Sequence, residues 1–345
     1  MAVLITGGAG FVGLNVAEQL LKRGDDVVLF GPAPPPAAAL AALQREPGRL
    51  LLAAGDVSQA SDLDAALGAH TIDRVIHGAA VTADLAREKR AARDIFTVNL
   101  LGTVEVLEAA LRHQVRRVVQ LGTGSIFGAA GKSGDMLDEQ TSVVLPESLY
   151  GISKFAAERT GLRYRQTRAL NLTVVRLGTV FGRWEYETGV RDSLSMALQL
   201  LRAAENGAEV VIHTETADDW VYSVDVALGL IALLDLPETP EPVYHLSAGM
   251  RWSVEGWCRR LQERFPRFNY RLTDRLEECT LGRTKAAMRS PMSIARIRRD
   301  GGYEPAYLLD RAFDDYLAWR NTNREFGLNS PAGLQASGSA PRPIS

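Results

Sequence analysis

The sequence predicts an α/β protein, with a doubly wound parallel sheet followed by a smaller, partly helical C-terminal region. Short apolar segments rich in β-branched residues alternate with segments whose apolar residues recur at helical spacing. That alternation is typical of a parallel sheet covered by helices on both faces. The 345-residue chain is also 46% hydrophobic and 23% charged, the balance of an ordinary globular protein with ample material for a core.

The expected elements follow one another in a regular order up to about residue 183. Buried strands are expected at 2–6, 26–30, 49–57, 74–80, 116–122 and 171–178. The clearest helices are expected at 12–24, 91–113 and 150–169. Beyond residue 183 the pattern becomes irregular, although 192–207 and 253–265 still favour helix.

Composition and charge exclude several classes of function. The net charge of −2 leaves no basic surplus for nucleic acid, and no apolar run reaches the length of about 18 residues that a membrane span needs. Neither the two cysteines, Cys258 and Cys279, nor the five histidines show metal-ligand spacing, so no metal site is expected. The apolar N-terminus is interrupted by TGGAG, which argues against a signal peptide. We therefore expect a cytoplasmic protein that acts on a small molecule.

A glycine-rich turn, LITGGAGFVG, joins the first expected strand to the first expected helix. Gly7, Gly10 and Gly13 give the spacing G-x-x-G-x-x-G. Glycines permit the tight turn and let the backbone approach a pyrophosphate, while the helix N-terminus offers free N–H groups. The strand before it and the helix after it are the context that a dinucleotide site requires, so a Rossmann-type fold is predicted.

These observations divide the chain into three parts. We expect a dinucleotide-binding domain over 1–183, with parts of 208–247 returning to it, and a substrate-binding region over 184–326. The last segment, 327–345, is rich in Gly, Ala, Ser and Pro, and we expect it to be disordered.

The end of the second expected strand carries an unusual residue for a dinucleotide site. A carboxylate is expected there to hold the adenosine ribose, but the sequence has Gly31. No lysine or arginine occurs from Gly31 to Leu43, so no cation is present to receive the 2′-phosphate of NADP. We expect NAD as the cofactor and leave NADP as an alternative.

Tyr150 and Lys154 lie four residues apart in SLYGISKFAAE, on one face of an expected helix. Together with the glycine turn, the chain from residue 2 to about 250 resembles the extended short-chain dehydrogenase/reductases, also called NAD-dependent epimerase/dehydratases. HGAA at 77–80, VNLLGT at 98–103 and LGTGSIFG at 121–128 match segments of that family in order, and Tyr150 and Lys154 match its Y-x-x-x-K.

The resemblance implies a role for particular residues. It makes Thr123, Tyr150 and Lys154 the catalytic residues. It implies cofactor contacts from Gly7, Gly10, Phe11, Val12, Gly13, Asp56, Val57, Gly78, Ala79, Ala80, Asn99, Tyr150, Lys154, Gly178 and Val180. It implies substrate contacts from Thr82, Gly124, Ser125, Thr179, Arg183 and Arg191.

The implied chemistry is proton transfer coupled to hydride transfer at a secondary alcohol or ketone. Tyr150 is expected to act as base in one direction and acid in the other. Lys154 is expected to hold the nicotinamide ribose and to lower the tyrosine pKa, and Thr123 to orient the substrate oxygen. The nicotinamide carries the redox chemistry.

Several positions depart from the family pattern. Gly124 and Ser125 stand where dehydratases of the family carry acids, so water elimination is disfavoured. Thr179 replaces the asparagine, and Asp218 the arginine, that are usual in nucleotide-sugar members. A carboxylate cannot make the two-pronged contact that arginine offers to a diphosphate, and Arg176, Arg183, Arg191 or Arg251 could substitute. Arg183 and Arg191 have the best positions.

Three functions therefore remain open from sequence. The first is an NAD(P)-dependent dehydrogenase or reductase acting on a small sugar-like substrate, and the second is a nucleotide-sugar epimerase in which bound NAD is transiently reduced. The third, a non-catalytic dinucleotide sensor, is disfavoured because it would not need Thr123, Tyr150 and Lys154. The family resemblance also implies a homodimer formed by the helices at 91–113 and 150–169. In the first of these, an apolar stripe joins Leu100, Val104, Leu107 and Leu111.

Overall fold

The computed structural model describes residues 2–132, 135–281, 289–323 and 326, so the expected disordered tail lies outside the described residues. A seven-stranded sheet forms the centre, in the order β11-β6-β5-β4-β1-β2-β3, and every neighbouring pair is parallel. Its strands are β1 (Ala2–Thr6), β2 (Asp26–Gly31), β3 (Leu50–Ala54), β4 (Ile72–His77), β5 (Arg117–Thr123), β6 (Leu172–Leu177) and β11 (Val243–Leu246). The predicted fold class is confirmed, and all six strands expected from sequence are present.

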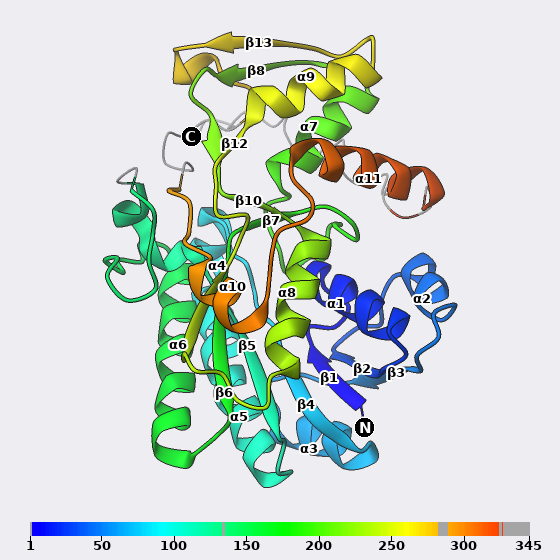
Figure 1. Cartoon of the computed structure of the whole chain (residues 1–345), viewed down its shortest axis with the longest axis vertical. Coiled ribbons are helices and arrows are strands. Elements are labelled where there is room, and N and C mark those ends of the chain that lie inside the picture. The colour runs from blue at the N-terminus through cyan, green and yellow to red at the C-terminus, as the bar shows by residue number, and fades with distance from the viewer. Residues whose placement is uncertain (1, 133–134, 282–288, 324–325, 327–345) are drawn as a thin grey trace, which may run out of the picture.

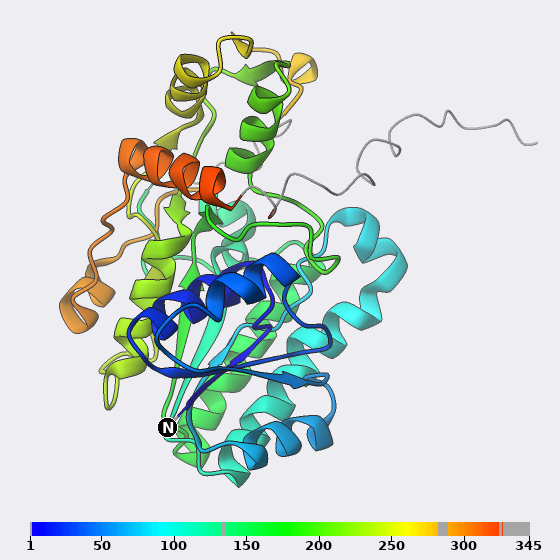
Figure 2. The ribbon, with the colours of Figure 1, turned by 90° about the vertical axis from the view of Figure 1, so that its right-hand side faces the viewer.

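Helices cover both faces of this sheet, as Figures 1 and 2 show. One face carries α1 (Phe11–Lys22), α2 (Ala37–Leu43) and α8 (Ser223–Asp235), and the other carries α3 (Ala60–Ala69), α5 (Gly102–Arg112) and α6 (Leu149–Arg168). The helix expected at 91–113 is divided into α4 (Leu85–Phe96), a π-helical turn η1 (Thr97–Leu101) and α5. Two separate buried clusters, one on each face, form the core.

The chain order of the strands reverses between β1 and β4. From β1 the sheet continues through β2 and β3 in one direction, and from β4 through β5 and β6 in the other. In the register of the sheet, Thr6 of β1 is opposite His77 of β4, so these two carboxyl ends are level. Ligands of open α/β sheets bind at such a switch point, beyond the carboxyl ends of the strands.

The C-terminal elements assemble beyond that edge (Figure 1). The outer part contains α7 (Met196–Glu205), α9 (Val254–Arg264) and the parallel pair β8 (Glu209–His213) and β13 (Asn269–Thr273). Two further pairs connect it to the sheet: β7 (Thr179–Phe181) with β10 (Trp220–Tyr222), and β9 (Ala217–Asp218) with β12 (Trp252–Ser253). The remaining elements are the 3₁₀ segments η2 (Gly124–Lys132) and η3 (Leu276–Glu278), and the helices α10 (Ala295–Gly301) and α11 (Leu309–Thr322).

A buried aromatic cluster fixes this connection. The ring of Phe181 lies 5.3–5.5 Å from those of Trp220, Tyr222, Trp252 and Trp257. Aromatic pairs at such spacing add to the free energy gained by burial. The irregular sequence pattern beyond residue 183 reflects these short, buried strands, which are too brief to show a period.

The apolar stripe on the helix expected at 91–113 is partly internal, with Leu100 and Val104 half-buried. Leu107 is fully buried in the core cluster beneath α5, and Leu111 packs against the same cluster. Exposed apolar side chains occur nearby instead, with Leu101 55% and Ile152 38% exposed. Leu107 and Leu111 of the stripe therefore contribute to the core of this chain.

Candidate active site

The glycine turn is built for close backbone approach. Gly7 has a positive φ of 67°, and a Cβ there would lie 2.9 Å from the backbone of Ala79. A Cβ on Gly13 would lie only 2.5 Å from the carbonyl oxygen of Gly7, so the first turn of α1 packs directly on the loop. The turn is closed by a hydrogen bond of 2.9 Å from the Gly10 N–H to the Gly7 carbonyl. The residues present therefore fit the pyrophosphate of a dinucleotide.

The active-site helix α6 is held in place by Asn99. Its side chain accepts a hydrogen bond from the Val81 N–H (2.7 Å) and donates to the Val81 carbonyl and to the Ser153 hydroxyl (both 3.0 Å). Ser153 in turn donates to the carbonyl of Tyr150. Asn99 lies in the π-helical turn η1, a distortion that often marks functional sites. Ser148 caps the start of α6 by accepting from the Gly151 N–H, which places Tyr150 in the first turn.

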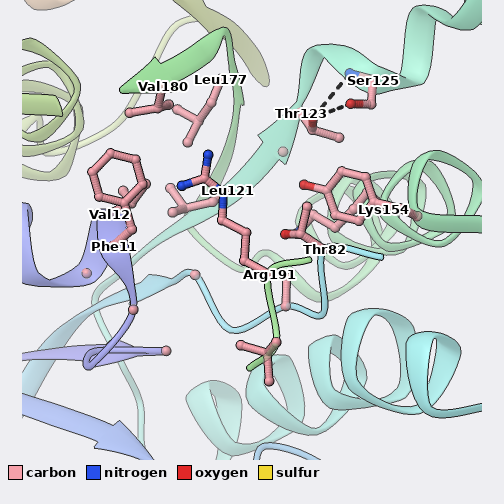
Figure 3. A pocket seen from close by; sticks show the side chains of 18 of the residues that line it. Phe11, Val12, Thr82, Leu121, Thr123, Ser125, Lys154, Leu177, Val180 and Arg191 are labelled. Carbon is pink, nitrogen blue, oxygen red and sulfur yellow. Dashed lines mark hydrogen bonds between the residues drawn. The ribbon is translucent and has the colours of Figure 1, made fainter. Parts of the chain in front are cut away.

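Three hydroxyl groups converge at the reacting end of the pocket. Tyr150, Thr123 at the end of β5 and Thr82 in the segment after β4 line the same pocket, and both threonines act on the pKa of the Tyr150 phenol. Thr123 also donates to the Ser125 hydroxyl (3.2 Å) and accepts from the Ser125 N–H (3.1 Å). Figure 3 shows Thr82, Thr123 and Ser125 beside Lys154. This arrangement can bind a substrate oxygen and move a proton to or from it.

Burial dominates the electrostatics of the catalytic pair. Burial raises the pKa of Tyr150 above its usual value, while the neighbouring Thr123 and Thr82 side chains and the charges of Arg191 and Arg289 act in the opposite direction. The pKa of Lys154 is lowered to about 8 by burial, and the charge of Glu158 opposes that shift. Burial therefore outweighs the opposing charges at Tyr150, and the expectation that Lys154 lowers the tyrosine pKa beside a bound cofactor stays a prediction.

One pocket of about 320 Å³ gathers most of the predicted site residues (Figure 3). From the cofactor set it is lined by Gly7, Gly10, Phe11, Val12, Gly13, Gly78, Ala80, Tyr150, Lys154, Gly178 and Val180. From the catalytic and substrate sets it is lined by Thr123, Thr82, Ser125, Thr179 and Arg191. Thr188, Val190 and Ser193, which the sequence did not indicate, complete one wall.

Other predicted contacts lie outside the lining. Asn99 and Ala79 lie behind the residues that line the pocket. Asp56 and Val57 follow β3 at the edge of the sheet. Asp56 is exposed there and accepts two hydrogen bonds of 2.8 Å from Ser58. Gly124 is covered by Arg289. The adenine contact of Asp56 and Val57 stays a prediction.

Arg183 is a correction to the substrate set. Its guanidinium forms a two-pronged ion pair with Asp315 of α11, and its carbonyl accepts from Asn15 of α1 (2.7 Å). These contacts direct it away from the pocket, which it does not line. Sequence alone does not distinguish a structural arginine from a ligand-binding one, because the partner that holds Arg183, Asp315, lies 132 residues further along the chain.

Arg289 is the charged pocket residue that the sequence analysis missed. It lines the pocket and donates from Nη2 to the Thr179 hydroxyl at 3.2 Å. Its charge also lowers the pKa values of Asp218 and Asp219, although burial raises both above their usual range, that of Asp219 to about 7. The repulsion expected from Asp218 is thus reduced by a neighbouring cation. No local motif marks Arg289, which reaches the site through the fold of the C-terminal region.

His77, at the end of β4, links β1 to α5, and it gives the fold a pH dependence. Its ring is fully buried between the hydroxyls of Thr6 (2.7 Å) and Thr103 (3.0 Å). Burial, aided by the charge of Lys154, lowers the pKa of His77 to about 3. The unfolded chain binds a proton near pH 6.5, so stability falls as the pH drops from about 6.5 towards 3.

Within that window, we expect His77 to lower the free energy of unfolding by about 1 kcal/mol for each unit by which the pH falls. Urea unfolding at pH 7 and pH 5 measures the loss, and the variant His77→Gln should show a shallower dependence. NMR titration of the ring provides a second measurement that does not depend on the variant folding. A ring that becomes protonated in the native state above pH 5 would contradict the expectation.

The fold and this pocket define a Rossmann-type dinucleotide enzyme with a Y-x-x-x-K pair. The chain belongs to the NAD dependent epimerase/dehydratase family, whose model matches residues 3–249. The resemblance drawn from sequence is therefore confirmed, as are the expected NAD dependence and enzyme class at the level of the family.

The relatives and structural neighbours are distant. The chain is 24% identical to a dTDP-glucose 4,6-dehydratase of Actinoplanes sp., over 94% of this chain and 99% of that protein. It is similar in fold to a UDP-glucose 4-epimerase of Thermotoga maritima solved with UDP-glucose (TM-score 0.77, 21% identity, 94% of this chain and 100% of that one). A dTDP-glucose 4,6-dehydratase of Streptomyces venezuelae solved with NAD matches as well (TM-score 0.77, 22% identity, 95% and 99%).

Proposed function

We propose that the protein catalyses NAD-dependent oxidation or reduction at a secondary alcohol or ketone of a sugar-like substrate. The observation that carries this proposal is the convergence of the Tyr150, Thr123 and Thr82 hydroxyls beside the glycine turn. Tyr150 moves the proton of the substrate oxygen, Thr123 orients that oxygen, and Lys154 holds the nicotinamide ribose. When bound, NAD supplies the hydride chemistry.

A nucleotide-sugar epimerase is the second candidate, and the wall formed by residues 184–193 favours it. Tyr186 donates to the carbonyl of Ala9 in the glycine turn (2.6 Å), and Asp192 forms a two-pronged ion pair with Arg87 of α4 (both 2.7 Å). Thr82 and Val190 add a backbone hydrogen bond of 2.8 Å. A wall tied down at both ends slows exchange of the cofactor, which suits a reaction that returns the hydride to its substrate.

The two candidates differ in the fate of the cofactor. A dehydrogenase accumulates reduced nicotinamide when it is given substrate and excess NAD, whereas an epimerase shows no net change in absorbance. A substrate screen with both neutral and nucleotide-linked sugars, followed by absorbance and by NMR of the products, distinguishes them. Dehydration remains disfavoured despite the names of the relatives, because Gly124 and Ser125 carry no carboxylate.

We expect NAD to bind more tightly than NADP. Gly31 ends β2, and a Cβ placed there would meet no atom within 4 Å, so the adenosine side of the site is open and lacks a carboxylate. The variant Gly31→Asp should bind NAD more tightly and widen the preference over NADP, because a carboxylate there hydrogen-bonds the ribose hydroxyls. Calorimetry with both cofactors, against Gly31→Ala as control, measures this. Tighter binding of NADP by the natural chain would contradict it.

We further propose that the protein is a cytoplasmic homodimer. Leu101 and Ile152 are exposed apolar residues on η1 and α6, which suits helix pairing across a two-fold axis. In the part of the chain that the structure describes, no helix is long and apolar enough to cross a membrane. Light scattering at micromolar concentration should give twice the mass of one chain, and Leu101→Glu should reduce it to that of a monomer. A monomeric mass for the natural chain would refute the dimer.

A further inference from the structure

The guanidinium of Arg289 occupies the space directly above Gly124, the residue after Thr123. A Cβ on Gly124 would lie 2.7 Å from Arg289 Cζ, 2.8 Å from Nη1 and 2.9 Å from Nε. Any side chain at position 124 would therefore collide with the guanidinium. Gly124 stands where dehydratases of the family carry an acid. Its lack of a side chain also makes room for a cation at the reacting end of the pocket.

The hydrogen-bonding capacity of this guanidinium is only partly used. Nη2 donates to the Thr179 hydroxyl at 3.2 Å, whereas Nε is buried and has no hydrogen-bond partner. Among the residues that the structure describes, no salt bridge to Arg289 is found. A buried guanidinium edge without a partner is costly, and the planar fork suits a carboxylate best.

The other pocket arginine is already engaged. Arg191 forms a salt bridge of 2.9 Å with the buried carboxylate of Glu185 and stacks on the Phe11 ring at 5.0 Å. Its position is fixed further by the pairing of residue 191 with Thr82. Arg191 Nη1 makes no hydrogen bond either, but its charge is paired with Glu185, whereas Arg289 has no ion pair among the described residues. Arg289 also covers Gly124, the residue that follows Thr123.

We infer that the reacting end of the pocket binds a carboxylate of the substrate, carried close to the reacting carbon as in a hexuronate. Arg289 is the residue that determines this specificity, and Gly124 makes room for it. The inference rests on the proposed function, since it specifies the substrate class of the same site. A neutral hydroxymethyl group in that place offers one uncharged acceptor, whereas a carboxylate offers two charged oxygens to the guanidinium, so the site favours the carboxylate.

A competing explanation makes Arg289 a structural counter-ion for Asp218 and Asp219. Its charge acts on both carboxylates, and Arg289 shares Thr179 with Asp218. However, the side chain of Asp219 already accepts from the Met292 N–H at 3.1 Å. A purely structural arginine would alter stability when replaced and would leave substrate preference unchanged.

The test compares matched substrates on the NAD-loaded protein. Glucose and glucuronate, each free and as the UDP derivative, differ only in the group attached beside the reacting position. Turnover is followed by reduced-nicotinamide absorbance and by NMR of the products, and binding by calorimetry. The proteins are the natural chain, Arg289→Gln, Gly124→Ala and, as a control for loss of one charge, Arg259→Gln, whose side chain is 64% exposed on α9.

We expect the natural chain and Arg259→Gln to prefer the uronate. Arg289→Gln should raise KM for the uronate by about tenfold to a hundredfold relative to KM for the neutral sugar, whereas any effect through the Tyr150 pKa is common to both sugars and leaves their ratio unchanged. Gly124→Ala keeps the charge but displaces the guanidinium, so it should weaken the same preference. Turnover of the neutral sugar without preference for the uronate, or a preference that survives both variants, overturns the inference and leaves the proposed function standing. Turnover and binding of neither sugar overturns both.

Discussion

Replacing Tyr150 with phenylalanine is expected to lower turnover by roughly a hundredfold or more, because it removes the group that exchanges a proton with the substrate oxygen. Tyr150 lines the pocket together with Thr123 and Thr82, and no other phenol lines the pocket among the residues described. The ring itself remains, so the packing of α6 and the binding of NAD should be unchanged. Steady-state kinetics, calorimetry with NAD and thermal unfolding separate these effects.

The same helix offers a matched control. Tyr164 is also on α6, but its hydroxyl donates to Glu108 of α5 at 2.6 Å, outside the pocket. Tyr164→Phe should therefore lose about 1 kcal/mol of stability and keep its turnover. Near-normal activity in Tyr150→Phe, or an equal loss in the two variants, would remove Tyr150 from the role of acid and base.

The sequence predicted those parts of the site whose contacts form between residues close together along the chain. The glycine turn and the Tyr150–Lys154 pair are local patterns, and they are found where the sequence placed them. The partners of Arg183 and Arg289 lie more than a hundred residues away, at Asp315 and Thr179. Sequence alone could list both arginines, but only the packing of the C-terminal region decides which one enters the pocket.

The pKa of Tyr150 is a second property of the site that a local sequence motif could not predict. An adjacent lysine on a helix suggests a lowered value, yet burial of the phenol dominates, and the opposing charges come from Arg191 and Arg289. Burial depends on every element around the pocket, so a motif cannot supply it. The short strands β7, β9, β10 and β12 escaped prediction for a related reason, because two or three residues carry no period.

Substituting Gly13 with alanine is expected to produce the largest loss of cofactor binding. The added Cβ would lie 2.5 Å from the Gly7 carbonyl oxygen and 2.8 Å from that of Gly8. Both obstacles are backbone atoms, so the turn itself must move, and with it the N–H groups that face the pyrophosphate. We expect NAD affinity to fall by roughly a hundredfold, which corresponds to about 3 kcal/mol.

A second glycine separates this effect from a general cost of substitution. Gly68 lies in α3, where an added Cβ would meet only the His113 ring, at 3.9 Å. Gly68→Ala should keep NAD affinity and gain up to about 1 kcal/mol of stability, because alanine is the better helix former. Calorimetry with NAD and thermal unfolding of the cofactor-free proteins measure both quantities. If Gly13→Ala bound NAD as tightly as Gly68→Ala, the pyrophosphate would not lie on this turn, because a ligand held by these N–H groups must respond when the backbone beneath it is displaced.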